Sequence, residues 1–139
     1  MRRVASLLLA SLLLLASASA AADLVVVTNI ASGVDKLTRA EAVNIFMGRY
    51  KKLPSGMAAL PIDEEGEKAA FYRALVGKEL PEIQSYWARL VFSGQGSPPR
   101  QMENAGEVID IVANNKGAIG YVDRKKLSPR VRIVLDLAQ

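Results

Sequence analysis

The 139-residue sequence contains no cysteine and no histidine, and aromatic residues make up only 6% of it. Without cysteine the chain cannot form a disulfide, and it cannot carry the lipid that lipoproteins attach to a cysteine. Without histidine it lacks the commonest general base and the commonest zinc ligand. We therefore expect a domain stabilised by its packed core alone, with no enzyme activity, no bound metal and no cofactor.

Only the N-terminus carries a long apolar run. Arg2 and Arg3 precede the apolar residues 4–16, and Ala18-Ser19-Ala20 matches the small-x-small pattern that signal peptidases cleave. The run is shorter than the roughly 20 residues of a membrane-spanning helix, although an uncleaved anchor is the alternative interpretation. We expect residues 1–20 to be a signal peptide, cleaved after Ala20 or two residues later, and residues 21–139 to form a soluble periplasmic domain.

The charge balance is weakly basic. The chain has 18 basic and 14 acidic residues, a net charge of +4, and removal of Arg2 and Arg3 leaves 16 against 14, a net +2. This excess is too small to indicate nucleic-acid binding. A basic cluster near the C-terminus is interpreted as a solvated loop, with contact to an anionic surface as the alternative. The cluster consists of Arg124, Lys125, Lys126, Arg130 and Arg132.

Strand and helix patterns alternate along the rest of the chain, which indicates one α/β domain. Strands are expected near residues 24–27, 58–62, 118–122 and 131–135, and the last of these alternates inward at Val131, Ile133 and Leu135. Helices are expected near 38–48, 66–76, 81–91 and 104–115. Two of them begin with a capping pair, Thr38 with Glu41 and Asn104 with Glu107.

The third helix has an apolar stripe at Ile83, Trp87, Leu90 and Val91, with the spacing of a face that points to the core. We interpret Trp87 as a core residue, and a platform for a ligand is the alternative. Gly120, inside a strand pattern, indicates a close approach or a bend of the backbone.

An ordered series of apolar and glycine signatures runs through the chain. It comprises Leu37-Thr38, Ile45-Phe46-Met47-Gly48, Ala70-Phe71-Tyr72, Tyr86-Trp87-Ala88-Arg89, Phe92-Ser93-Gly94-Gln95-Gly96 before Pro98-Pro99, and Gly117-Ala118-Ile119-Gly120-Tyr121-Val122. In order and spacing the series resembles the carboxy-proximal lobe of phosphate-type periplasmic solute-binding proteins, above all the short, stand-alone phosphate ABC transporter substrate-binding proteins. The resemblance runs from Leu24 to Val122.

The resemblance implies a single lobe of a type II periplasmic-binding-protein-like fold, with a mixed sheet flanked by helices. In two-lobed members of that family the ligand lies between the lobes, and here Leu24–Thr28 and Ala118–Val122 match the segments that cross between them. The second lobe has no counterpart in this sequence. One lobe supplies only half of a ligand-enclosing wall, since small-ligand sites bury about 70–90% of the ligand surface.

The family's anion site in this lobe has a Ser-Gly-Thr type sequence at a helix start, preceded by an arginine. The corresponding stretch here carries the carboxylates Asp63, Glu64, Glu65 and Glu67 instead. We interpret it as a solvated, helix-stabilising N-terminus and discount phosphate binding there. A divalent-cation site and a catalytic carboxylate pair are the alternatives.

The rim after the first strand, with Thr28, Asn29 and Ser32, is the candidate site for a small phosphate-like anion, because ligands of α/β sheets sit beyond the carboxyl ends of strands. A simple loop turn is the alternative. Two functions are compatible with these features. One is a periplasmic, non-catalytic binding module with weak or lost phosphate binding. The other is a structural or regulatory envelope protein that acts through contact with a protein partner or a second lobe. A hydrolase is the remote third.

Overall fold

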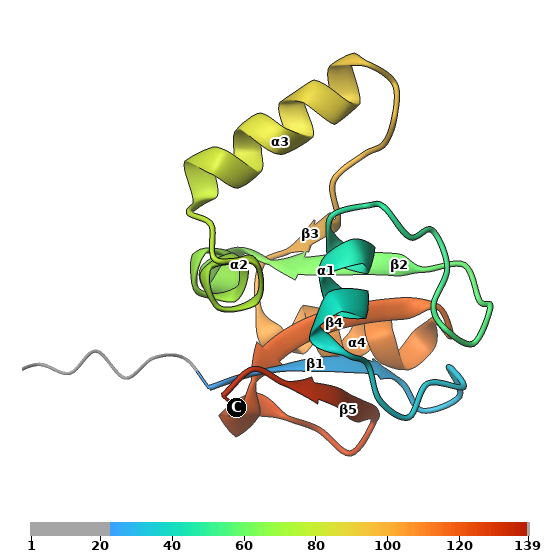
Figure 1. Ribbon diagram of the computed structural model, residues 1–139. Coiled ribbons are helices and arrows are strands. Elements are labelled where there is room, and N and C mark those ends of the chain that lie inside the picture. The colour runs from blue at the N-terminus through green and yellow to red at the C-terminus, as the bar shows by residue number, and fades with distance from the viewer. Residues whose placement is uncertain (1–22, 139) are drawn as a thin grey trace, which may run out of the picture.

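The computed structural model describes residues 23–138, so the expected signal peptide lies outside the described residues. The expected strands and helices are present in the expected order (Figure 1). The elements are β1 (Leu24–Asn29), α1 (Arg39–Phe46), β2 (Leu60–Glu64), the 3-10 turn η2 (Glu65–Glu67), α2 (Lys68–Val76), α3 (Leu80–Phe92), β3 (Arg100–Met102), α4 (Ala105–Asn114), β4 (Ala118–Asp123), the 3-10 turn η3 (Arg124–Lys126) and β5 (Val131–Asp136). The short strand β3 carries only three residues and was not expected from the sequence.

The strands form one mixed sheet in the order β3-β2-β4-β1-β5. β1 pairs antiparallel with β4 on one side and with β5 on the other. β2 pairs parallel with both β3 and β4. The two segments that the resemblance matched to lobe-crossing strands, β1 and β4, are therefore direct neighbours in the middle of the sheet.

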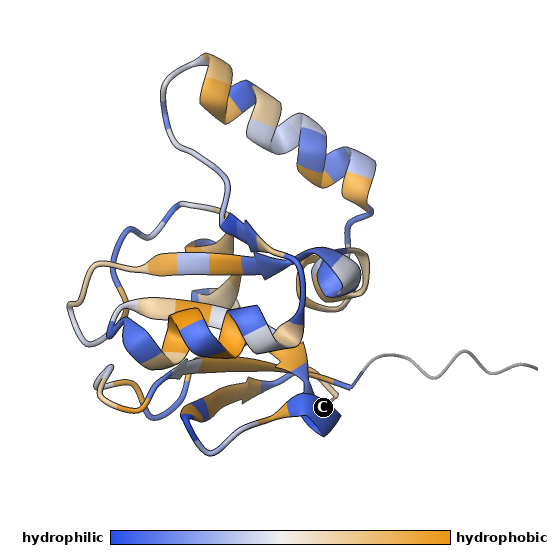
Figure 2. Ribbon diagram, turned by 180° about the vertical axis from the view of Figure 1, so that it is seen from behind, coloured by the Kyte–Doolittle hydropathy of each residue, from blue (hydrophilic) through white to orange (hydrophobic). Residues whose placement is uncertain are grey.

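Helices cover both faces of this sheet, which makes a three-layer α/β domain (Figures 1 and 2). On one face α1, α2 and α3 bury a core around Phe46, Phe71 and Trp87. On the other face α4 packs Val108 and Val112 against the sheet. The α/β fold with a mixed sheet flanked by helices is thus confirmed. α3 stands farthest from the sheet in both views and is joined to it by the connector 93–99.

The helix starts follow the capping signals in the sequence. Thr38 and Glu41 form the expected capping box, since the Thr38 hydroxyl accepts from Glu41 N–H at 3.0 Å and the Glu41 carboxylate accepts from Thr38 N–H at 2.9 Å. The Asn104 side chain accepts from Glu107 N–H at 3.0 Å at the start of α4. The prediction for Gly120 is also confirmed, because a Cβ there would lie 2.8 Å from Val108 Cγ1.

Two predictions about core positions are wrong. Val91 was assigned to the core-facing stripe of α3, but it is 53% exposed, because this end of the helix stands away from the sheet. The inward alternation of β5 is confirmed only at Val131, since Ile133 is 37% exposed and Val134 is buried instead. The register of β1 against β5 shifts between Val26 and Val27. This bulge places Ile133 opposite Val27 and Leu135 opposite Val26, so that the two side chains face opposite sides of the sheet.

No helix among residues 23–138 is long and apolar enough to cross a membrane.

Candidate functional site

The carboxyl end of β2 places two acidic side chains inside the protein. Asp63 is 1% exposed and Glu64 is 4% exposed. The interpretation of this stretch as a solvated helix start is therefore wrong for these two residues, because β2 continues through Glu64 and carries them into the sheet. In Figure 2 most of β2 is coloured as hydrophobic, and its carboxyl end, drawn as the arrowhead, is coloured as hydrophilic.

Asp63 is held by two tyrosines. Its Oδ1 accepts hydrogen bonds from the hydroxyls of Tyr72 on α2, at 2.8 Å, and Tyr121 on β4, at 3.1 Å. Lys68 Nζ lies 3.9 Å from Oδ2. The Tyr121 ring is itself held in place, since Phe71 stacks on it with the ring centroids 3.6 Å apart. The carboxylate therefore has a fixed position in a packed aromatic environment.

Burial raises the pKa of Asp63 above its ordinary value, and the hydrogen bonds from the tyrosines and the charge of Lys68 oppose this rise. The pKa values of Tyr72 and Tyr121 are also raised, first by burial and then by the neighbouring Asp63. Both hydroxyls therefore stay protonated and act as donors. Both tyrosine hydroxyls donate their hydrogen bonds to Asp63, so neither is available as a donor to an incoming anion.

Glu64 lies beside Asp63 in a less satisfied environment. Its Oε2 is buried and has no hydrogen-bond partner among the described residues. Burial and the neighbouring Glu67 raise the pKa of Glu64, while Lys126 lowers it. Glu67 is the N-cap residue of α2, and its side chain makes no capping hydrogen bond. The start of α2 thus faces carboxylates where an oxyanion would need donors.

The three residues of the predicted anion rim lie together at the end of β1, but their polar atoms serve the fold. The Asn29 amide donates to the carbonyls of Val112 and Ala113 at 2.8 and 2.9 Å, which ties β1 to the end of α4. The Ser32 hydroxyl donates to Thr28 Oγ1 at 3.2 Å. All three side chains are buried. An anion at this rim would have to compete with these hydrogen bonds.

Among residues 23–138, no group of three acidic side chains is arranged to hold a metal ion. The basic cluster is also only partly free in solvent. Arg124 forms ion pairs with Asp23 and Asp136, Arg130 with Asp110, and Arg132 with Asp35. These pairs join β5 and the turn before it to the rest of the domain, so most of the cluster has a local structural use.

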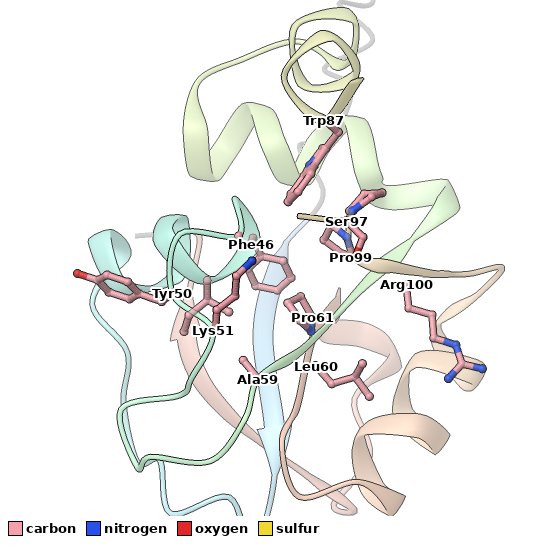
Figure 3. A pocket seen from close by; sticks show the side chains of 13 residues that line it. Phe46, Tyr50, Lys51, Ala59, Leu60, Pro61, Trp87, Ser97, Pro99 and Arg100 are labelled. Atoms are coloured by element: carbon pink, nitrogen blue, oxygen red, sulfur yellow. The ribbon is translucent and has the colours of Figure 1, made fainter. Parts of the chain in front are cut away.

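A cavity of about 320 Å³ lies at the other end of β2, between α1, α3 and the connector 93–99 (Figure 3). Its lining is formed by Ile45, Phe46, Gly48, Tyr50, Lys51, Ala59, Leu60, Pro61, Trp87, Ser97, Pro98, Pro99 and Arg100. Trp87 is 7% exposed, so its prediction as a buried residue is confirmed, yet its ring also forms one wall of this cavity.

The contact of α3 with α1 shapes the cavity. The Tyr86 hydroxyl donates to the Met47 carbonyl at 2.6 Å. The Trp87 ring lies against Gly48, whose φ of 76° and missing Cβ make room for it. The Trp87 N–H is buried without a partner among the described residues, and such a donor costs about 1–3 kcal/mol. Sequence reasoning missed this site because its residues come from four separated segments, although Gly48, Trp87 and Pro98-Pro99 stood out as signatures.

Comparison with solved structures identifies the architecture. The fold is similar to that of an ABC-type phosphate transport receptor from Vibrio cholerae, with a TM-score of 0.64 and 15% identity over 81% of this chain and 45% of the other. It is also similar to a phosphate ABC transporter substrate-binding protein from Clostridium perfringens, solved with bound phosphate (TM-score 0.60, 17% identity, 81% and 44% covered). PstS from Borrelia burgdorferi matches with a TM-score of 0.55 and 14% identity, over 81% and 46% of the two chains.

The chain therefore has the phosphate-type periplasmic-binding-protein fold, and it spans less than half the length of these solved proteins. No family model and no curated protein sequence matches it. At identities of 14–17% the likeness establishes the fold. What the domain binds has to be argued from its own residues.

Proposed function

We propose that the protein is a non-catalytic periplasmic binding module, related to phosphate ABC transporter substrate-binding proteins, in which phosphate binding is weak or lost. The observation that carries this proposal is the pair of buried carboxylates at the end of β2, Asp63 with 1% and Glu64 with 4% exposure. They occupy the stretch where the resembling family has its oxyanion donors.

The physical argument is one of charge and enclosure. A phosphate at the start of α2 would meet Glu64 and Glu67, and like charge at a helix N-terminus removes the attraction that the helix dipole offers. Burying an anion without matched donors is costly. In two-lobed members of the resembling family the ligand lies between the lobes, and this domain, which covers less than half the length of the solved proteins, corresponds to one lobe and so to one wall.

The rim of Thr28, Asn29 and Ser32 remains our proposed place for any weak phosphate-like anion. Its backbone lies at the carboxyl end of a central strand, which is the usual position of ligands in α/β sheets. Binding there would require Asn29 to exchange its bonds with α4 for bonds to the anion, and we therefore expect low affinity.

A second candidate function is that of an envelope interaction protein that keeps one lobe and acts through a protein contact. The exposed end of α3 favours it, because Phe92 is 95% exposed and Val91 is 53% exposed there. Large apolar side chains that are neighbours on a surface are typical of contact sites. This function needs no small ligand.

Calorimetric titration of the mature protein with phosphate, at neutral pH and low salt, tests the first proposal, because attraction is least screened there. We expect a dissociation constant no lower than about 1 mM, which corresponds to about −4 kcal/mol. Glu64→Gln should strengthen any binding at the start of α2, and Glu65→Gln is the matched control at an exposed position. Micromolar one-to-one binding to the unmodified protein would contradict the proposal, and Asn29→Ala and Ser32→Ala would then show whether the rim is responsible.

A further inference from the structure

We propose that the cavity beneath Trp87 is a second binding site, and that its ligand is a small monocarboxylate with one aromatic or branched apolar group. The site lies at the start of β2 and β3, whereas Asp63 and Glu64 lie where β2 ends. The lining also contains none of the rim residues Thr28, Asn29 and Ser32. The proposal is thus separate from the proposed function, and phosphate binding at the rim or at the start of α2 neither supports nor weakens it.

The apolar part of the ligand is indicated by the walls of the cavity. Phe46 from α1, Pro61 from β2 and Trp87 from α3 face the same space (Figure 3). Pro98 and Pro99 form a further wall, and proline rings hold their backbone in a restricted conformation. The cavity is therefore preformed, which lowers the entropic cost of binding. Its volume of about 320 Å³ is at the small end of ligand sites and fits a molecule with a single ring.

The anionic part of the ligand is indicated by the charges of the lining. Its charged side chains, Lys51 and Arg100, are both cationic. Figure 3 shows the Lys51 amine beside the Phe46 ring, whereas the Arg100 guanidinium points away from the cavity. Among the described residues Lys51 takes part in no ion pair. An ammonium group without a counter-ion at the edge of an apolar cavity favours a carboxylate ligand.

The Lys51 amine and the Trp87 ring both lie close to Gly96. A Cβ on Gly96 would lie 3.5 Å from Lys51 Nζ and 3.8 Å from Trp87 Cζ3. The cation and the aromatic wall are thus close enough for one small ligand to touch both. A carboxylate on such a ligand has acceptor oxygens for the Lys51 ammonium.

The test uses the protein's single tryptophan as the reporter, because every change in tryptophan emission comes from Trp87. Phenylacetate is the probe, and 2-phenylethanol is its uncharged analogue. We expect phenylacetate to change the emission saturably, with a dissociation constant below about 1 mM, and to shift the indole N–H resonance in ¹H–¹⁵N spectra. The alcohol should bind more weakly.

Two variants decide whether the ligand is in this cavity. Lys51→Gln should weaken phenylacetate binding about threefold or more and leave the alcohol unaffected, and Lys52→Gln, whose side chain is outside the lining, should change neither. A Cβ on Gly96 would make only ordinary van der Waals contacts, so a larger side chain can be introduced there. Gly96→Leu should therefore fill the cavity and abolish binding of both probes. Melting temperatures check that each variant is folded.

Three results would overturn the proposal. One is the absence of a saturable response of the folded protein to phenylacetate in both spectra. Another is equal binding of the acid and the alcohol with no effect of Lys51→Gln, which would mean an apolar hollow without an anion site. The last is unchanged phenylacetate binding by folded Gly96→Leu, which would place the probe elsewhere.

Discussion

The Trp87 ring lies so close to Gly48 that a Cβ on that glycine would come within 2.7 Å of Cη2. Gly48 follows the end of α1, and its φ is 76°. The same residue thus ends a helix in the left-handed conformation and provides the space that lets α3 pack onto α1. The absence of a side chain at Gly48 therefore allows both the left-handed backbone conformation and the close packing of Trp87.

Gly48→Ala should therefore lower the free energy of unfolding through both effects. The matched control is Gly77→Ala, since Gly77 ends α2 with a nearly equal φ of 74° and no atom within 4 Å of its Cβ position. The left-handed conformation should cost each variant about 1–2 kcal/mol. Overpacking against Trp87 should cost Gly48→Ala about 1–3 kcal/mol more. Denaturant unfolding measures both, and equal losses would show that the Trp87 ring moves without cost.

The buried Asp63 should make stability depend on pH in a defined direction. Its pKa is raised above the ordinary value of 3.8 in the folded protein, mainly by burial. A raised carboxyl pKa means that the folded state holds the proton more tightly, so this group's contribution is fully present below about pH 3.8 and is lost as the pH rises through the folded pKa.

Asp63→Asn keeps an acceptor for the Tyr72 and Tyr121 hydroxyls and removes the charge. Relative to the unmodified protein, this variant should gain stability as the pH is raised from below about 3.8 to neutrality. Thermal unfolding across this range measures the gain, and Glu65→Gln controls for the change in net charge at an exposed position. A stability difference that moves in the opposite direction would mean that Lys68 and the tyrosines outweigh burial.

Asn29 should prove important for stability whether or not an anion binds near it. Asn29→Ala removes both hydrogen bonds to the Val112 and Ala113 carbonyls and leaves those acceptors buried or half-buried. We expect a loss of about 1–3 kcal/mol in chemical denaturation. Asn44→Ala on α1, whose side chain accepts an exposed hydrogen bond from Arg49, should cost less. Equal losses would argue that the Asn29 amide is not bound to α4 in solution.

Export should remove the N-terminal segment. If residues 1–20 are a signal peptide, the secreted protein begins at Ala21 or close to it, because Ala18-Ser19-Ala20 is the cleavage pattern. Intact-mass measurement of the protein from the periplasmic fraction checks this. A retained Met1 together with recovery in the membrane fraction would contradict it.

The local signals in the sequence were the reliable ones. The Thr38 and Asn104 caps lie where expected, because capping depends on residues only three positions apart. The apolar run Leu24–Val27 of β1 is buried on both faces, as its composition predicts.

The features that could not be predicted from the sequence depend on tertiary packing. Val91 has a core-facing spacing, but α3 diverges from the sheet and leaves it exposed. The bulge opposite Val26 and Val27 turns Leu135 to the other face of the sheet from Ile133, and no glycine or proline within β5 indicates it. The burial of Asp63 depends on two tyrosine hydroxyls, and one of them, Tyr121, is 58 residues away along the chain. The cavity beneath Trp87 is assembled from segments that only the fold brings together.

The place of β1 in the sheet also constrains how this protein acquires its structure over time. β1 is the first of the described strands, yet both of its neighbours, β4 and β5, are the last of them. The ion pair between Asp23 and Arg124 joins residues 101 positions apart. A chain that emerges with its N-terminus first cannot pair this strand until nearly every residue has appeared. Domains dominated by such distant contacts fold slowly, because the entropy of closing a long loop is lost before the contacts form. Until then the apolar run Leu24–Val27 is an unpaired strand and a hazard for aggregation.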